Sequence, residues 1–363
     1  MVPADIAKLV GKGVAITVES GMGEPSRHPD RAYQEAGARV STERTKLLSE
    51  TDVVLRVRKP PLSEVGQLRA GCIHVSFLDP FNQAELVDEL ARCNITAISM
   101  EMLPRITRAQ KMDALSSQAS LAGYVAVILA AERLDKIFPM MMTPAGTIAP
   151  ARVFVIGAGV AGLQAIATAK RLGARVEAFD TRPVVAEQVE SLGAKFVQVD
   201  LGDTGQTAGG YAKELTREQQ QMQQEAMAKV CAHSDVVITT AQLFGRPAPR
   251  IITRQMLEPM APGSIVVDLA VESGGNVEGS ELDREVELNG VRIIGLANLP
   301  GRLAVHASQM YSANMTALVE EFYSEEAESF SLDFDDEIIQ GCVITHGGEI
   351  VNPMLRDLRN ANN

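Results

Sequence analysis

The chain has 363 residues, more than one domain usually contains, so two domains of ordinary size are expected. Hydrophobic residues make up 46% of the chain and charged residues 22%, a composition typical of a globular protein. The net charge of −12 argues against nucleic-acid binding, because a protein that binds a duplex needs a basic surface to displace counterions.

Short strands and helices alternate over residues 1–125, which we assign to an N-terminal domain. Strands are expected at 13–20, 52–60, 71–80 and 95–101, and helices at 29–38 and 81–93. Strands that alternate with helices predict a parallel sheet flanked by helices. A strand-like tail around Gly347 and Gly348 is expected to return to this domain, so that segment 325–363 completes it.

The start of one apolar helix carries more hydrogen-bonding side chains than a helix start needs. These side chains belong to Arg105, Gln110, Asp113 and Ser116. One interpretation is that Asp113 or Ser116 caps the helix and that the other two are solvated. The other is a binding edge that faces a polar ligand. The residue types alone favour the capping interpretation.

A second series of strands begins near residue 151, within a predicted nucleotide-binding domain at 140–320. Strands are expected at 151–159, 174–180, 194–200, 234–241, 263–270 and 291–300. The predicted fold class is α/β, with two Rossmann-like domains, each a mostly parallel sheet flanked by helices, and a cleft between them. The stretch 201–232 is longer than a crossover between two strands requires.

The chain lacks the patterns of a secreted, membrane-spanning or metal-binding protein. Segment 138–169 is long and apolar, but prolines, glycines and Arg152 interrupt it, so we expect it to be buried without membrane insertion. Residues 1–13 lack the apolar core of a signal peptide. The four cysteines form no CxxC pair and the five histidines are scattered, so we expect reduced thiols, no metal site and a cytoplasmic location.

A glycine motif follows the strand that begins the second series. Its residues are Gly157, Ala158, Gly159, Val160, Ala161 and Gly162. In such a motif one glycine makes a tight turn, one lets the backbone approach a pyrophosphate, and one lets helix and strand pack closely. The following helix presents free N–H groups and a partial positive charge to the phosphates. The motif predicts a dinucleotide site.

An acidic residue ends the next strand, at the separation expected for recognition of the adenosine ribose. Asp180 can accept hydrogen bonds from both ribose hydroxyls, and its charge would repel a 2′-phosphate, so NAD(H) is preferred to NADP(H). Thr181 and Arg182 follow it, and Arg182 leaves open that a 2′-phosphate is held instead. Ala241 and Leu269 follow two further strands and are expected to line the nicotinamide half of the site.

No obvious acid–base residue accompanies this site. A dehydrogenase that acts on an alcohol or amine normally uses a His or Lys to move the proton. His28 lies in a predicted turn, and His74 lies in mid-strand, where a core or edge histidine is the favoured interpretation. His306 and His346 have no assigned place.

Segments along nearly the whole chain resemble one family. They are 104–124, 138–147, 150–174, 187–196, 207–214, 262–276 and 348–353. In these segments the chain resembles the alanine dehydrogenase/transhydrogenase family. Within it, the similarity is to the NAD(H)-binding component, the soluble part of the alpha subunit, of proton-translocating transhydrogenases. Alanine dehydrogenases have a catalytic Lys and a catalytic His where this chain has Arg58 and Asp79.

The resemblance implies direct hydride transfer from NADH to NADP⁺ held on a partner subunit, which needs positioning rather than acid–base chemistry. It implies that Gln110 reaches towards the second nucleotide, that Asp113 and Ser116 orient the carboxamide side of NAD, and that Arg105 holds it from the flank. It also implies that segment 207–214, with Gly210 and Tyr211, closes over the nucleotide.

Membrane-spanning subunits that translocate protons and a homodimer are further implications of the resemblance, with the chain bound peripherally to the inner membrane through its partners. Two alternatives stay open. One is an alanine-type amino acid dehydrogenase with a displaced acid–base such as Lys59 or His74. The other is a non-catalytic NAD(H)-binding module.

Overall fold

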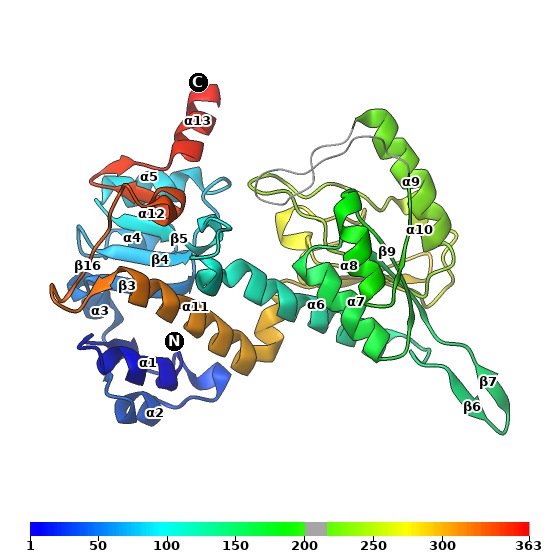
Figure 1. The fold of residues 1–363 in the computed structure, drawn as a ribbon, viewed down its shortest axis with the longest axis horizontal. Coiled ribbons are helices and arrows are strands. Elements are labelled where there is room, and N and C mark those ends of the chain that lie inside the picture. Colours follow the sequence, from blue (N-terminus) through cyan, green and yellow to red (C-terminus); the bar gives the residue numbers. More distant parts are fainter. Residues whose placement is uncertain (200–215, 363) are drawn as a thin grey trace. The chain divides into compact units, whose positions relative to one another are not determined.

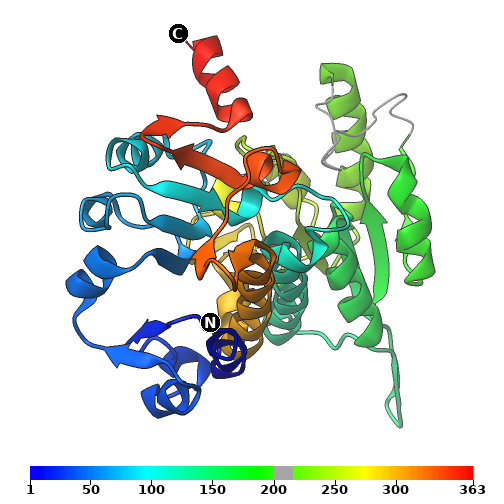
Figure 2. The same ribbon diagram turned by 60° about the vertical axis from the view of Figure 1, so that its left-hand side comes forward.

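The computed structural model describes residues 1–199 and 216–362 (Figures 1 and 2). Contacts within the chain divide it into two compact units. Unit 1 contains Met1–Gln118 and Ala304–Asn363, and unit 2 contains Ala119–Leu303.

Unit 1 is built around a five-stranded sheet. In spatial order its strands are β18 (Glu349–Ile350), β17 (Val343–His346), β5 (Thr96–Ser99), β4 (Ile73–Phe77) and β3 (Val53–Arg58). Strands β3, β4 and β5 are parallel, and β17 pairs antiparallel with β5, so a C-terminal hairpin extends a sheet made by the N-terminal half. Gly347 and Gly348 form the turn of that hairpin with φ of 60° and 85°, values that suit glycine.

The first predicted strand does not join this sheet. Strand β1 (Thr17–Glu19) pairs instead with β2 (Arg39–Ser41) in a small parallel sheet. A local core of its own, which includes Ile6, Val18 and Tyr33, supports this small sheet. Because periodicity shows only which faces of a strand are apolar, it could not indicate which sheet β1 would enter.

Short helices complete unit 1. They are α1 (Pro3–Val10), α2 (Asp30–Glu35), α3 (Arg44–Glu50), α4 (Leu62–Val65), α5 (Ala84–Arg92), α11 (Ala304–Phe322), α12 (Glu337–Cys342) and α13 (Pro353–Asn362), and β15 (Tyr323–Ser324) pairs with β16 (Ser329–Phe330). Helix α11 groups with this unit, whereas the sequence prediction placed residues 304–320 in the nucleotide-binding domain. Long-range hydrogen bonds explain the grouping, since the Tyr311 hydroxyl donates to the Arg56 carbonyl at 2.7 Å.

Unit 2 contains a seven-stranded sheet. In spatial order its strands are β10 (Lys195–Phe196), β9 (Arg175–Phe179), β8 (Arg152–Ile156), β11 (Val236–Thr239), β12 (Ile265–Asp268), β14 (Val291–Gly295) and β13 (Arg284–Leu288). All pairings are parallel except that of β13 with β14. The first six strands have the order of a doubly wound dinucleotide-binding sheet. The predicted α/β fold class with helix-flanked parallel sheets is confirmed.

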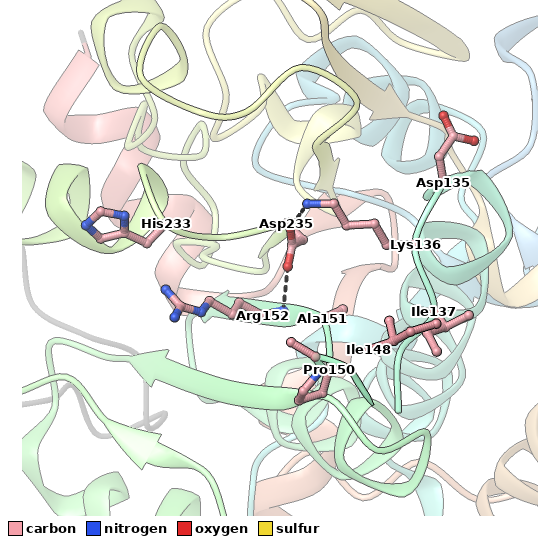
Figure 3. Close-up of a pocket in the computed structure, with 10 residues that line it drawn as sticks. Asp135, Lys136, Ile137, Ile148, Pro150, Ala151, Arg152, His233 and Asp235 are labelled. Atoms are coloured by element: carbon pink, nitrogen blue, oxygen red, sulfur yellow. Dashed lines mark hydrogen bonds and ion pairs between the residues drawn. The ribbon is translucent and has the colours of Figure 1, made fainter. Parts of the chain in front are cut away.

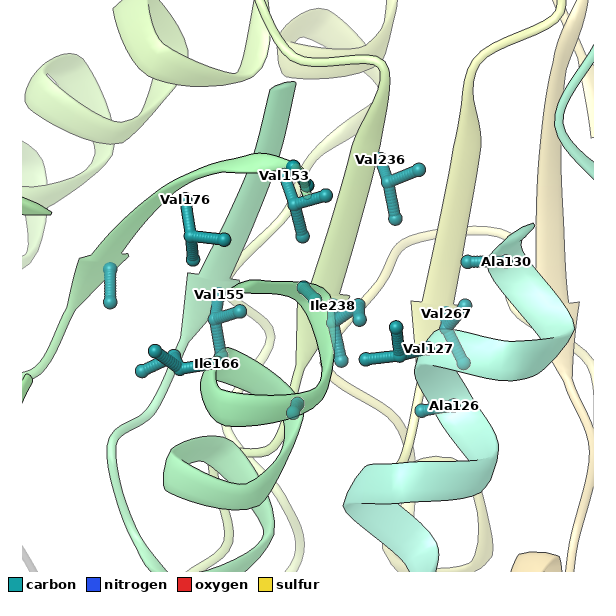
Figure 4. Close-up of a cluster of buried hydrophobic side chains, with 14 of the residues drawn as sticks. Ala126, Val127, Ala130, Val153, Val155, Ile166, Val176, Val236, Ile238 and Val267 are labelled. Atoms are coloured by element: carbon teal, nitrogen blue, oxygen red, sulfur yellow. The ribbon is translucent and has the colours of Figure 1, made fainter. Parts of the chain in front are cut away.

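Helices cover both faces of this sheet. Helices α6 (Ala114–Arg133), α7 (Val160–Arg171) and α8 (Ala186–Ser191) pack on the face that carries Val153 and Val155 (Figure 4). Helices α9 (Arg217–Cys231) and α10 (Arg254–Leu257) cover the face that carries Phe154 and Ile156. Since successive strand residues point to opposite faces, strands that are apolar throughout become buried on both sides.

Two features of unit 2 concern the apolar segments noted in the sequence. A hairpin of β6 (Met141–Thr143) and β7 (Gly146–Ile148) extends away from the sheet (Figure 1). Among the described helices, α6 alone is long and apolar enough to cross a membrane by length and composition. Its Ala126, Val127 and Ala130 lie in the unit 2 core, which accounts for the apolar composition without a membrane.

Candidate functional site

The glycine motif lies at the carboxyl end of β8, where α7 begins. Gly157 has a φ of 95°, and a Cβ there would lie 2.5 Å from the Thr240 hydroxyl oxygen. A Cβ on Gly162 would lie 1.8 Å from the Gly157 carbonyl oxygen. A Cβ on Gly159 would meet no atom within 4 Å. Two of these glycines are therefore required by the fold itself, while Gly159 faces open space.

The open position coincides with the start of a helix. Gly159 is the N-cap residue of α7 and has no side chain with which to cap it, and Val160, the first residue of the helix, is exposed. The N–H groups in the first turn of a helix have no partner within the helix and favour an anion. This is the arrangement that a pyrophosphate requires, so the residues present fit a dinucleotide.

Asp180, immediately after β9, is held beneath the glycine loop. Its Oδ2 accepts a hydrogen bond from the Ala158 N–H at 2.7 Å, and its Oδ1 accepts one from the Arg182 N–H at 2.8 Å. The Arg182 guanidinium also contacts both oxygens at 2.9 Å, and the carboxylate is 6% exposed. Thr181, between them, is half-buried.

This ion pair changes the expectation for both residues. The hydrogen bond to Asp180 raises the pKa of Arg182 above its ordinary value, so the guanidinium is committed to the carboxylate. The carboxylate would accept ribose hydroxyls only after the guanidinium moves aside. The sequence spacing predicted the position of Asp180 correctly but gave no indication of this pairing.

The ends of β11 and β12 are joined by a buried polar network that sequence reasoning missed. The Asn276 carboxamide accepts from the Ala241 N–H at 3.1 Å and donates to the Ala241 carbonyl at 2.8 Å. The Asp268 carboxylate accepts from the Asn276 N–H at 3.2 Å, and both side chains are fully buried. Leu269 follows Asp268, and its N–H donates to the Thr239 carbonyl at 3.0 Å. Ala241 and Leu269 thus lie at the edge where the glycine loop lies, as predicted for parallel strands.

The segment with four hydrogen-bonding side chains lies in unit 1. Asp113 accepts a hydrogen bond from the Ser116 N–H at 2.8 Å and so caps α6, as the capping interpretation predicted. Gln110 begins a single 3₁₀ turn, η3 (Gln110–Met112), and is exposed, as is Arg105. The backbone of this turn therefore presents the Gln110 side chain to solvent.

Two further site residues from the sequence analysis, Gly210 and Tyr211, lie outside the described residues. Their place in the site stays a prediction.

The residues considered as an acid–base occupy unsuitable places. His74 is fully buried in β4, neither ring nitrogen has a hydrogen-bond partner, and burial lowers its pKa to about 3. It is therefore neutral and inaccessible near neutral pH. Lys59 lies 3.4 Å from the Asp79 carboxylate, in an ion pair at the end of the unit 1 strands.

A pocket of about 630 Å³ in unit 2 lies at the opposite edge of the sheet (Figure 3). It lies at the amino ends of β8 and β11, where Asp235 accepts hydrogen bonds from the Lys136 ammonium at 2.5 Å and from the Arg152 N–H at 2.8 Å. None of the predicted site residues lines it. Ligands of open α/β sheets bind at the carboxyl ends of strands, so the glycine loop remains the candidate site.

Two family models match the chain. Residues 1–122 match the model described as "Alanine dehydrogenase/PNT, N-terminal domain", and residues 126–353 match "Alanine dehydrogenase/PNT, C-terminal domain". The chain belongs to this family. The resemblance deduced from the sequence segments is therefore confirmed.

Individual relatives favour the transhydrogenase branch. The chain is 44% identical over 360 residues to the first polypeptide of the NAD(P) transhydrogenase alpha subunit of Rhodospirillum rubrum, covering 97% of this chain and 94% of that protein. The crystal structure of the transhydrogenase from Sinorhizobium meliloti is 45% identical with a TM-score of 0.83, covering 97% of this chain and 94% of that one. An alanine dehydrogenase of Halomonas elongata is more distant, at 29% identity over 85% of this chain and 79% of that protein.

Proposed function

We propose that the chain is the NAD(H)-binding component of a proton-translocating NAD(P) transhydrogenase. The observation that carries the proposal is the open approach to Gly159 at the start of α7, in a chain that matches transhydrogenase alpha subunits over nearly its whole length. Bound NADH supplies a hydride, which passes to NADP⁺ held on a partner subunit. Membrane-spanning partners couple the transfer to proton translocation.

The residues of unit 2 bind and orient the dinucleotide. The first-turn N–H groups of α7 and the backbone at Gly159 hold the pyrophosphate, and Gly157 and Gly162 maintain the close packing that exposes them. Asp180 accepts the adenosine-ribose hydroxyls after Arg182 moves aside, which favours NAD(H) over NADP(H). Ala241 and Leu269, at the ends of β11 and β12, line the nicotinamide half.

The residues of the 105–116 segment position the nicotinamide for transfer. Gln110 reaches towards the second nucleotide, Asp113 and Ser116 orient the carboxamide side, and Arg105 supports the flank. Since no proton is delivered to a substrate, amide, carboxylate and guanidinium groups are sufficient. The buried, neutral His74 supports this chemistry over that of an amino acid dehydrogenase.

A homodimer is part of the proposal. Met140, Met142 and Ile148 on the β6–β7 hairpin are 61%, 80% and 46% exposed. Apolar side chains that project on an extended hairpin favour burial against another protein surface, and a second copy of the chain would bury the hairpins reciprocally. We further propose that the chain is cytoplasmic and bound peripherally to the inner membrane through its partner subunits.

Two reaction mixtures test the function. The first contains the pure chain, NADH, pyruvate and ammonia. The second contains the chain, NADH, an NADP(H)-binding transhydrogenase component loaded with NADP⁺, and an oxidised NAD analogue with a distinct absorbance. We expect turnover only in the second mixture. Turnover in the first would replace the proposal with an alanine-type dehydrogenase, and NADH binding without turnover in either would indicate a non-catalytic binding module.

A further inference from the structure

Helix α11 holds several distant segments of unit 1 through buried polar side chains. The Ser312 hydroxyl accepts from the Val2 N–H at 2.8 Å and donates to the Asp5 carboxylate at 2.5 Å. The Tyr311 hydroxyl donates to the Arg56 carbonyl on β3. Both side chains lie on a helix 19 residues long, so α11 is a firmly anchored support.

Asn314 extends this pattern to the segment before α6. Its Nδ2 donates to the Lys111 carbonyl at 2.8 Å, and its Oδ1 accepts from the Ser117 hydroxyl at 2.7 Å. The Lys111 carbonyl can only accept, so the orientation of the carboxamide is determined by its partners. The residue is 8% exposed, which makes the two hydrogen bonds difficult to replace with water.

These two hydrogen bonds bracket the proposed transfer residues. Lys111 lies in η3 directly after Gln110 and two residues before Asp113. Ser117 directly follows Ser116 in the first turn of α6. Met112 lies between them and is 2% exposed, so the turn is also held by an apolar side chain.

We propose that Asn314 is a positioning residue for hydride transfer, a role that rests on the proposed function above. It contacts no reacting atom. Its carboxamide holds the peptide at Lys111 and the first turn of α6 at fixed separation, and so sets where the Gln110 and Asp113 side chains point. Asn314 is separated from the segment by about 200 residues of sequence and no motif includes it.

The test compares Asn314→Ala with a control on the same helix. Thr316→Val removes a buried hydroxyl that donates to the Ser312 carbonyl at 2.8 Å and makes no contact with the segment. For both variants the measurements are Tm, the NADH dissociation constant and the single-turnover transfer rate with the NADP(H)-binding component. Asn314→Ala is expected to slow transfer roughly 10- to 100-fold, because small misplacements in a proximity-driven reaction are costly. Its NADH affinity is expected to stay within about threefold of wild type, since it removes no contact with the pyrophosphate site.

A second readout does not depend on activity. Asn314→Ala should increase tryptic cleavage after Lys111 by roughly tenfold, because losing about 1 kcal/mol of local hydrogen bonding opens the turn more often. Asn314→Asp keeps an acceptor for Ser117 but loses the donor to Lys111, so its transfer rate should be reduced as well, even if the alanine variant folds poorly.

Transfer at the wild-type rate in folded Asn314→Ala or Asn314→Asp would overturn the positioning role. So would an equal loss of rate in Thr316→Val at the same loss of Tm, because that would show a general effect of destabilising α11. A wild-type chain without transfer in the partner mixture would instead contradict the proposed function, while the cleavage experiment would still report whether Asn314 holds the turn.

Discussion

The two units have the same kind of strand edge, but they use it differently. In unit 1 the chain's own groups fill the edge. Glu101 accepts hydrogen bonds from the N–H groups of Leu78 and Asp79, just past β4, and from the Ser99 hydroxyl at the end of β5. Lys59 pairs with Asp79 across the ends of β3 and β4. In unit 2 the corresponding edge leaves Gly159 facing open space.

This difference shows that a parallel sheet with helices provides an edge but not a site. Backbone N–H groups at strand ends need acceptors, and the acceptor can be a carboxylate of the chain or a group of a ligand. Glu101 takes that role in unit 1, and a pyrophosphate is proposed to take it in unit 2. Substitutions at these positions should therefore separate stability from binding.

The largest expected effect comes from the matched pair Gly162→Ala and Gly159→Ala. A Cβ at Gly162 would lie 1.8 Å from the Gly157 carbonyl, so the free energy of unfolding should fall by about 3 kcal/mol or more. Gly159→Ala has room for its Cβ and a φ of −78°, so its unfolding midpoint in urea should match wild type. NADH affinity should nevertheless fall at least about tenfold, because the methyl group blocks the backbone approach. Wild-type NADH affinity in Gly159→Ala would contradict the assignment of the site.

The next largest effect concerns pH and the closed interior of unit 1. Burial, and then the nearby Arg56 charge, lower the pKa of His74 from 6.5 to about 3, while Glu64 acts in the opposite direction. Between these two pH values the unfolded chain binds a proton that the folded chain does not. Stability should therefore fall as the pH drops below 6.5, approaching about 1.4 kcal/mol per pH unit. Above pH 6.5 this contribution is constant.

Urea unfolding of wild type and His74→Val at pH 7.5, 6.5, 5.5 and 5.0 measures this contribution. The difference between the two stability curves isolates His74 from the carboxylates that titrate in both proteins. Parallel curves would mean that His74 is protonated in the folded state as readily as in the unfolded state.

The smallest expected effect is on the unit 1 edge. Glu101→Ala leaves the N–H groups of Leu78 and Asp79 without their acceptor, which should cost about 1–3 kcal/mol of unfolding free energy. Glu101→Gln keeps one acceptor oxygen and should lose less. NADH affinity, measured by fluorescence titration, should be unchanged in both variants. A weaker affinity would mean that the closed edge also serves the nucleotide.

Local sequence was sufficient to predict several of these features. The glycine spacing and the acid at Asp180 predicted the unit 2 loop, because the turn, the helix start and the strand end are consecutive in the chain. The capping role of Asp113 was also predicted, since its partner Ser116 is only three residues away. The antiparallel β13 was missed, because its five residues alternate charged and apolar side chains and resemble a surface loop.

Long-range partners were beyond the reach of sequence patterns. Asn276 holds Ala241 from 35 residues away, and Asn314 holds Lys111 from 203 residues away. An Asn in sequence shows a donor and an acceptor but not which backbone groups they meet. The neutral state of His74 likewise depends on neighbours from other strands that remove it from water.

The sequence by itself determined the α/β class, the nucleotide loop and the family, because these follow from periodicity, local turn chemistry and residue identity over short spans. Tertiary structure alone decided that Arg182 occupies the Asp180 carboxylate, that Glu101 closes one strand edge, and that Gly159 leaves the other open. The physical reason is that hydrogen-bond satisfaction is a property of the packed chain, settled only when distant donors and acceptors are brought together.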